Sequence, residues 1–219
     1  MKKNAIILVS LFFLSGCATY YTVRTNGYLD TVNTAGRIPV NSSFCVLTSQ
    51  NARNPILETE IKLKIEKLLT QRGYRIESFE KADFALSFIY TMGPGRTVTE
   101  ITPVYSPPET GTIQTFSSSG RTRTSIITYP SHTAYVPYRE TVYTSSLTIE
   151  VSEANSLKSS REEKKIWIGE AYSTSVNPDL RDAVNYLLVG AFEHFGENTG
   201  RSLIANIAEN DSRIKWLQQ

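Results

Sequence analysis

The sequence predicts an α+β domain in which a mostly antiparallel sheet of four to five strands carries two main helices on one face. Two segments, 55–72 and 178–195, have apolar residues at helical spacing, and an Asn-Pro pair stands at the start of each. Several shorter segments alternate apolar and polar residues, as strands with one buried face do. Residues 96–135 fit neither pattern, and we predict that they form a long irregular β-arm inserted between two strands.

The first sixteen residues have the three parts of a signal peptide. Two lysines form a positive region, an apolar run of ten residues ends at Leu14, and the small residues Ser15 and Gly16 precede Cys17. Ten residues span about half of a ~30 Å hydrocarbon core, which excludes a transmembrane helix. Residues 14–17 are typical of a bacterial lipobox. The alternative is an ordinary secretory signal that happens to contain a cysteine.

The resemblance to bacterial lipoprotein precursors implies cleavage before Cys17 and attachment of a diacylglycerol group to its sulfur, often with a further amide-linked acyl chain. Two or more acyl chains anchor a protein stably in a membrane. Aspartate after the cysteine tends to retain such lipoproteins in the inner membrane, whereas this chain has Ala18. We therefore expect the outer membrane, with the folded domain facing the periplasm.

Removal of residues 1–16 changes what the composition implies. It leaves 203 residues, which predicts a single domain over residues 17–219. It also removes two of the 23 basic residues and none of the 21 acidic ones, so the mature chain is neutral and gives no argument for nucleic-acid binding. Cys45 is then the only free cysteine, which excludes an intramolecular disulfide. We expect this residue in the core rather than as a nucleophile.

The predicted elements follow from local patterns along the chain. Asn54 and Pro55 are typical of a helix start, and Gly73 of a helix end. The charged residues of that helix, Lys64 among them, lie mostly off its apolar stripe and are predicted to form a solvated face. Strands are predicted at 20–24, 44–49, 74–79, 84–90, 141–152 and 166–176, and a C-terminal helical extension at 198–219.

The segment 96–135 is predicted to be the functional part of the chain. Sixteen of its 40 residues are Ser or Thr, four are Pro and only five are charged. A connection of this length in a compact domain is usually either functional or disordered. The residues expected to contact a partner are the arm's tyrosines and its one basic cluster, namely Tyr105, Arg121, Arg123, Tyr129, Tyr135 and Tyr138. The alternative is a poorly ordered insert with no role.

Four short motifs together resemble a known family. In chain order they are Gln-Arg-Gly-Tyr-Arg at 71–75, Lys-Ala-Asp-Phe-Ala-Leu-Ser-Phe at 81–88, Ser-Leu-Thr-Ile-Glu-Val at 146–151 and Lys-Ile-Trp-Ile-Gly-Glu-Ala at 165–171. This order resembles the DUF4136 family of bacterial lipoproteins over most of residues 20–195. The resemblance implies a small α+β domain on a lipid tether and no enzymatic activity that transfers to a residue here. The insert departs from the family by carrying Ser and Thr where many members carry Gly and Trp.

The sequence gives no support for catalytic, cofactor or metal chemistry. His132 has no other ligand-type residue at a suitable spacing, and His194 with Glu197 would leave a metal short of ligands. There is no Gly-x-Ser-x-Gly motif. The Gly-Pro-Gly at 93–95 lacks the Gly-Lys-Ser/Thr ending of a phosphate-binding loop.

Three functions compete. The favoured one is a non-enzymatic binding or envelope-assembly module that contacts the membrane through its anchor and an envelope protein or glycan through its arm. An alternative is a component of an outer-membrane pore or secretion assembly, with the arm inserted as a transmembrane hairpin. Five prolines between residues 103 and 137 count against that alternative. An enzyme acting on cell-wall material is supported only by the expected location.

Overall fold

The computed structural model describes residues 19–32, 38–49, 51–159 and 163–219. The described chain divides into two compact units. One unit, the body, contains the chain up to Thr91 together with Ser145–Ser173 and Asp179–Gln219. The other, the arm unit, contains Met92–Thr144 and Thr174–Pro178.

The described elements are ten strands and four helices. The strands are β1 (Tyr20–Leu29), β2 (Ser43–Val46), β3 (Arg75–Ile76), β4 (Phe84–Met92), β5 (Arg96–Ser106), β6 (Glu109–Phe116), β7 (Thr122–Tyr129), β8 (His132–Glu153), β9 (Lys165–Ser175) and β10 (Leu203–Ala208). The helices are α1 (Pro55–Gln71), α2 (Ala154–Lys158), α3 (Leu180–Glu193) and α4 (Ser212–Gln218).

The predicted fold class is wrong in two respects. The structure is mostly β, with 47% strand and 22% helix. Its main sheet has eight strands in the order β10-β1-β9-β8-β4-β2-β3, with β5 paired to β8, rather than four or five. The sheet is also mixed, because β2 runs parallel to both β3 and β4 whereas β1 runs antiparallel to β9 and β10.

Two elements account for much of this difference. Helix α1 connects β2 to β3, and a helical crossover returns the chain in the same direction, which makes the two strands parallel. Residues 203–208 form β10, where a helix was expected. This strand pairs with β1, a partner about 180 residues away in sequence. The apolar residues of 203–207 fit one helical turn, but the short segment also fits an edge strand.

The helix ends follow the predicted local chemistry. The side chain of Asn54 accepts a hydrogen bond from the Leu57 N–H at 3.1 Å, and Pro55 is the first residue of α1. Gly73 has φ of 86°, which places it beyond the helix end in the left-handed conformation. Helix α3 begins at Leu180 rather than at residue 178, because Asp179 caps it by accepting from the N–H groups of the first turn.

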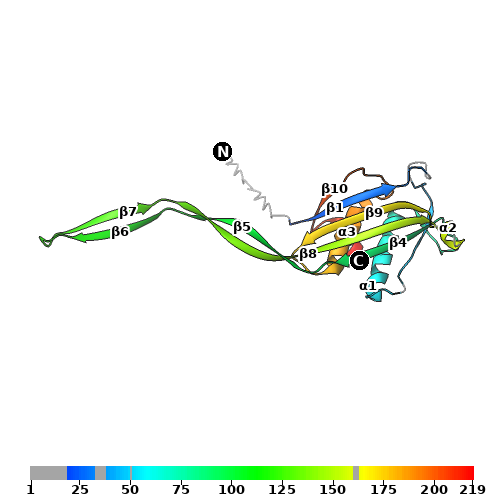
Figure 1. Cartoon of the computed structure of the whole chain (residues 1–219), viewed down its shortest axis with the longest axis horizontal. Helices are drawn as coiled ribbons and strands as arrows, with labels where there is room; N and C mark the ends of the chain where they lie inside the picture. Colours follow the sequence, from blue (N-terminus) through cyan, green and yellow to red (C-terminus); the bar gives the residue numbers. More distant parts are fainter. Residues whose placement is uncertain (1–18, 33–37, 50, 160–162) are drawn as a thin grey trace, which may run out of the picture. The chain divides into compact units, whose positions relative to one another are not determined.

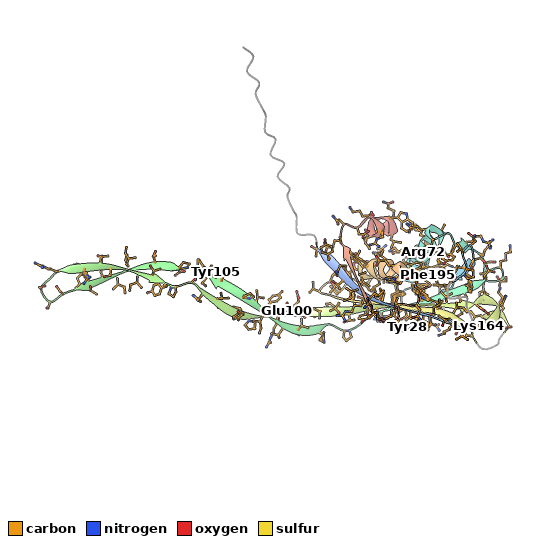
Figure 2. The ribbon with its side chains drawn as sticks, turned by 90° about the horizontal axis from the view of Figure 1, so that it is seen from above. Tyr28, Arg72, Glu100, Tyr105, Lys164 and Phe195 are labelled. Carbon is orange, nitrogen blue, oxygen red and sulfur yellow. The ribbon has the colours of Figure 1, made fainter. Side chains whose placement is uncertain are left out.

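The core lies between one face of the sheet and the long helices (Figures 1 and 2). Strand β8 contributes Leu147, Ile149 and Val151, which alternate with half-buried polar residues. Helix α1 contributes an apolar stripe and α3 is buried over most of its length. Burial of each large aliphatic side chain stabilises the fold by about 1.5–3 kcal/mol.

The Trp-x-Gly motif of β9 fixes how the end of α3 meets the sheet. Trp167 is 1% exposed, and a Cβ added at Gly169 would lie 2.1 Å from its indole ring, so the ring occupies the space above the glycine. The indole Nε1–H donates to the Glu197 carbonyl at 3.0 Å, and the ring centroid lies 4.8 Å from that of Phe195. The small residue therefore permits an inward-folded tryptophan that the segment after α3 covers.

The start of β4 is tied to β2 by a carboxylate. Asp83 Oδ2 accepts hydrogen bonds from the Ser43 hydroxyl at 2.7 Å and from the Ser43 N–H at 2.8 Å. The carbonyl of Asp83 also accepts from the Ala154 N–H. The hydrogen bonds from the side chain and then the backbone of Ser43 lower the pKa of Asp83, since they stabilise its charged form.

We predict that Gly169→Ala lowers the free energy of unfolding by about 2 kcal/mol, because the added methyl group overlaps the buried Trp167 ring. Urea denaturation measures the change. The matched control is Gly93→Ala, whose methyl group would lie 3.6 Å from its nearest neighbour and should have a smaller effect. An equal loss in both variants would contradict this role of Gly169.

We also predict that Asp83→Ala lowers the free energy of unfolding by about 1–2 kcal/mol at pH 7, because two donors of Ser43 lose their acceptor. The folded-state pKa of Asp83 is lowered, so its contribution is complete above the unfolded pKa of about 3.9. That contribution is lost as the pH falls through the lower folded-state pKa. Urea denaturation of both proteins between pH 7 and 2.5 should show the curves converging. A constant difference would contradict the assignment.

Candidate functional site

The arm unit contains a long antiparallel two-stranded ribbon (Figure 1). Strand β5 pairs with the first part of β8 over eleven residue pairs, from Arg96 opposite Val142 to Ser106 opposite His132. Strand β6 pairs with β7 over eight, from Glu109 opposite Tyr129 to the turn. The two ladders share one register. Counting on from Ser106 opposite His132, through two further residues on each strand, leads to Glu109 opposite Tyr129. The arm is therefore regular, and the prediction of an irregular β-arm is wrong.

The ribbon exposes large apolar side chains along its length. Ten of the nineteen exposed large hydrophobic residues in the described chain lie on it. They are Ile101, Val104, Tyr105, Ile113, Phe116, Ile126, Tyr129, Tyr135, Val136 and Tyr138. Their exposed fractions range from 43% to 76%, and Figure 2 shows side chains such as that of Tyr105 projecting from the ribbon. Two strands form one layer, so the ribbon has no second layer of its own against which to bury them.

The structure places five of the six predicted contact residues on the ribbon strands and Arg121 at the turn between β6 and β7. Successive residues of a strand point to opposite faces, so Tyr105, Arg123, Tyr129 and Tyr135 share one face while Tyr138 lies on the other. Tyr105 stands opposite Thr133, which makes Tyr135 its diagonal neighbour on that face.

A second candidate site is a groove of about 920 Å³ in the body. Helices α1 and α4 supply most of its lining, including Leu63, Lys67 and Trp216. The Lys67 ammonium lies 5.7 Å from the centre of the Trp216 ring, within the range of a cation–π contact. The groove thus has one aromatic surface and several charged groups.

Three lining residues of this groove, Glu60, Lys64 and Arg181, belong to an ionic cluster that joins α1 to α3. The buried Lys64 ammonium, with its residue 6% exposed, donates to Glu60 at 2.5 Å and to Asn185 at 2.8 Å. The other oxygen of Glu60 pairs with Arg181 at 2.8 Å. Partial burial acts to raise the pKa of Glu60, but the hydrogen bonds and charges of Lys64 and Arg181 lower it overall. Glu60 of α1 pairs with Arg181 of α3, and Lys64 of α1 donates to Asn185 of α3, so the cluster acts as a clasp between the helices.

The prediction that Lys64 belongs to a solvated face is wrong. The helical spacing contained the signal that would have corrected it. Lys64 stands three residues after Ile61 and four before Leu68, and both neighbours belong to the apolar stripe. A lysine in such a position needs a buried partner, and only the tertiary structure shows that Asn185 and Glu60 provide one.

Other residues considered for chemistry are placed as follows. His194 Nδ1 and Glu197 Oε2 lie 3.1 Å apart, so this pair does meet although α3 ends at Glu193. Within the described ranges no group of three or more His, Cys, Asp or Glu side chains is arranged to hold a metal ion. Cys45 is half-buried in β2, and burial raises the pKa of its thiol, which keeps it protonated.

Cys17 and the rest of the predicted signal peptide lie outside the described residues. The lipid-attachment site therefore stays a prediction from the sequence. None of the helices in the described part of the chain is long and apolar enough to cross a membrane.

Comparisons with known proteins add little to this geometry. No model of a known protein family matches the chain, and no curated protein is similar to it in sequence. Among solved structures the chain is similar to a PDZ domain protein from Parabacteroides distasonis, with 15% identity and a TM-score of 0.46. The match covers 85% of this chain and 39% of that one, so the chain spans well under half of that protein's length. This similarity carries no argument about function, and the resemblance to DUF4136 stays a prediction.

We predict that Lys64→Ala lowers the free energy of unfolding by about 2–4 kcal/mol, because it leaves the buried Asn185 oxygen and one oxygen of Glu60 without their donor. Lys62→Ala is the matched control on the same helix. Its ammonium lies 3.8 Å from Glu66 and its side chain is 36% exposed, so it should change stability by less than about 0.5 kcal/mol. Urea denaturation measures both, and similar values would contradict the clasp.

Proposed function

We propose that this chain is a non-enzymatic lipoprotein of the outer membrane that faces the periplasm, with the body as a scaffold and the ribbon of the arm unit as the element that binds an envelope partner. The observation that carries the proposal is the set of ten large apolar side chains exposed on a two-stranded ribbon. Large exposed apolar surfaces commonly mark interaction sites.

The chemistry of the ribbon suits contacts with a protein or a glycan. Tyrosine provides a large, rigid, amphipathic surface, and serine and threonine provide adaptable hydrogen bonds. The four exposed ribbon tyrosines, Tyr105, Tyr129, Tyr135 and Tyr138, are 53% to 72% exposed. A partner that covers them buries apolar area at little cost in side-chain entropy.

The membrane part of the proposal is supported by the lipobox sequence at 14–17 and by Ala18 after the cysteine. Strand β1 begins at Tyr20, three residues after Cys17. So short a connection would hold the body beside the membrane to which Cys17 is anchored.

A component of a pore or secretion assembly is the second candidate. The regular ladder of the ribbon favours it, because a membrane-inserted hairpin must be hydrogen-bonded along its whole length. The side chains are less favourable. One face of β6 and β7 holds Thr110, Thr112, Thr122, Thr124 and Thr128 and the other holds Glu109 and Arg123, so neither presents a continuous apolar surface to lipid.

We predict that replacing residues 96–142 by a two-residue Asn-Gly turn leaves the body folded and removes the envelope partner. The body has its own core, so its thermal unfolding midpoint should move by only a few degrees. Partner binding is measured by cross-linking in whole cells, and loss of the cross-linked species is the expected result.

A second variant separates the side chains from the length of the ribbon. The triple variant Tyr105→Ser, Tyr129→Ser and Tyr135→Ser should weaken cross-linking to the partner at least tenfold, because these three side chains supply one contact face. The matched control is the triple variant Thr97→Ser, Thr99→Ser and Thr133→Ser on the same face, which should change cross-linking less than twofold. A deletion variant that retains the partner, or a control that loses it equally, would contradict the proposed function.

A further inference from the structure

The end of the ribbon formed by β6 and β7, here called the tip, has two unpaired strand edges. Each tip strand pairs only with the other, so in the described chain no third strand joins either of them. Strand β5 and the first part of β8 contain Pro103 and Pro137, which lack an N–H group. The tip strands contain no proline.

The tip also lacks the other features that protect an exposed edge. Natural edge strands carry charged side chains, especially lysine, or bulges that turn the edge away. The sixteen tip strand residues include only two charges, Glu109 and Arg123, and their ladder runs without a bulge. Nine of the sixteen are Thr or Ile, which favour strand formation. Such a segment is well suited to accept another strand.

We propose that the tip pairs edge to edge with the tip of a second copy of this chain, so that β6 of one copy adds to β7 of the next. The proposal rests on the proposed function in one point. A shared membrane holds copies of the chain at high local concentration, and when two ribbons run in the same direction, β6 of one copy is antiparallel to β7 of the next.

The backbone of the tip determines which groups are available. The Ser117 N–H donates to the Arg121 carbonyl at 3.0 Å, in register with the ladder that begins at Phe116 opposite Thr122. Hydrogen-bonded pairs alternate along an antiparallel ladder, so odd-numbered tip residues bond within the ribbon and even-numbered residues direct their N–H and C=O groups outward.

The two outer edges match each other. Suppose that β6 of one copy pairs with β7 of the next in the same register that the two strands have within one ribbon. Even-numbered residues of β6 then lie opposite even-numbered residues of β7, and their outward N–H groups meet outward C=O groups. Thr112 then lies opposite Ile126 of the next copy, and Thr115 opposite Arg123 of that copy. No two like charges are opposed in this register, because Glu109 faces Tyr129.

A second copy is favoured over an unrelated strand because one copy supplies both complementary edges. Each addition leaves one β6 edge and one β7 edge free, and closure into a ring satisfies both. The rotation between successive copies decides between a closed ring and an open series. Binding of an extended peptide from another protein at one edge is the other outcome that the test distinguishes.

Disulfide formation between two single-site variants of the full chain tests this pairing. Thr112→Cys and Ile126→Cys are made separately with tags of different size, and Cys45 is kept in both. In a hydrogen-bonded pair the Cα atoms lie about 5.5 Å apart, a distance that a disulfide spans. After co-expression, oxidation of detergent-extracted protein should give the mixed dimer at least tenfold above either variant alone. A predominant homodimer of Thr112→Cys would overturn the β6-to-β7 pairing.

A proline substitution tests whether the outer backbone edge is responsible. Gln114 is even-numbered, so Gln114→Pro removes an outward N–H and spares the hydrogen bonds within the ribbon. Combined with Thr112→Cys, it should reduce the mixed disulfide at least tenfold. The matched control, Gln114→Ala, keeps the N–H and should stay within twofold. Equal effects of the two substitutions would overturn the edge assignment.

The remaining outcomes separate this inference from the proposed function. If purified full-length protein is monomeric and gives no mixed disulfide, or cross-links through the tip only to another protein, the self-pairing inference fails. The proposed function still holds if deletion of residues 96–142 removes an envelope partner. If copies cross-link as expected and that deletion removes no partner, self-pairing stands and the proposed function falls.

Discussion

The body depends on the packing of one tryptophan. Trp167 lies over Gly169 of its own strand, donates to the Glu197 carbonyl and contacts Phe195, so one indole connects β9 to the segment that follows α3. The same segment passes close to β1, where a Cβ at Gly27 would lie 2.5 Å from the Glu197 carbonyl oxygen. Two glycines on adjacent strands thus create the space in which the end of α3 meets the sheet. The positions of β1, β9 and α3 are coupled through this contact, because a side chain at either glycine would separate them.

How much of this fold the sequence predicts depends on whether the determinants are local. Asn54 and Gly73 were correctly identified as helix boundaries because a cap is decided within a few residues. The Asn-Pro pair before α3 predicted a start that is too early, because Asp179 is the residue that accepts hydrogen bonds from the first N–H groups of that helix. Strand pairing is decided by distant partners. Nothing in residues 203–208 indicates that they lie beside β1, and nothing in β2 alone indicates that its neighbours run parallel to it. The predicted number of strands and their predicted antiparallel arrangement were therefore wrong, whereas most of the individual helices and strands were predicted.

The candidate site shows the same division. The tyrosines and arginines of the arm were selected from composition, and the structure does place them on one extended element. Its regular ladder was missed because Ser, Thr and Pro dominate the segment, and these residues are typical of loops when they are considered singly. Their positions explain the regularity. Pro107, Pro108 and Pro130 fall between the two ladders, where they interrupt few of the hydrogen bonds. The prediction for Lys64 was wrong for a different reason. It was based on the charge of the side chain, which favours exposure to solvent, whereas the position of the residue on the helix required burial.

The energetics of the ribbon indicate why its surface matters more than its fold. Ordering a residue costs about 1–2 kcal/mol of backbone entropy. A ladder hydrogen bond returns about 0.5–1.5 kcal/mol, and each strand of an isolated pair makes such bonds on one side only. In the body the difference is offset by apolar burial. On the ribbon the corresponding side chains are 43% to 76% exposed, with Phe116 and Ile126 above 70%, so much of that offset is absent until something covers them. The free energy that a partner gains by burying them also stabilises the ribbon, so binding and ordering of the arm are thermodynamically linked. The sequence of the tip, low in charge and free of proline, lets that partner contribute backbone hydrogen bonds as well as side-chain contacts.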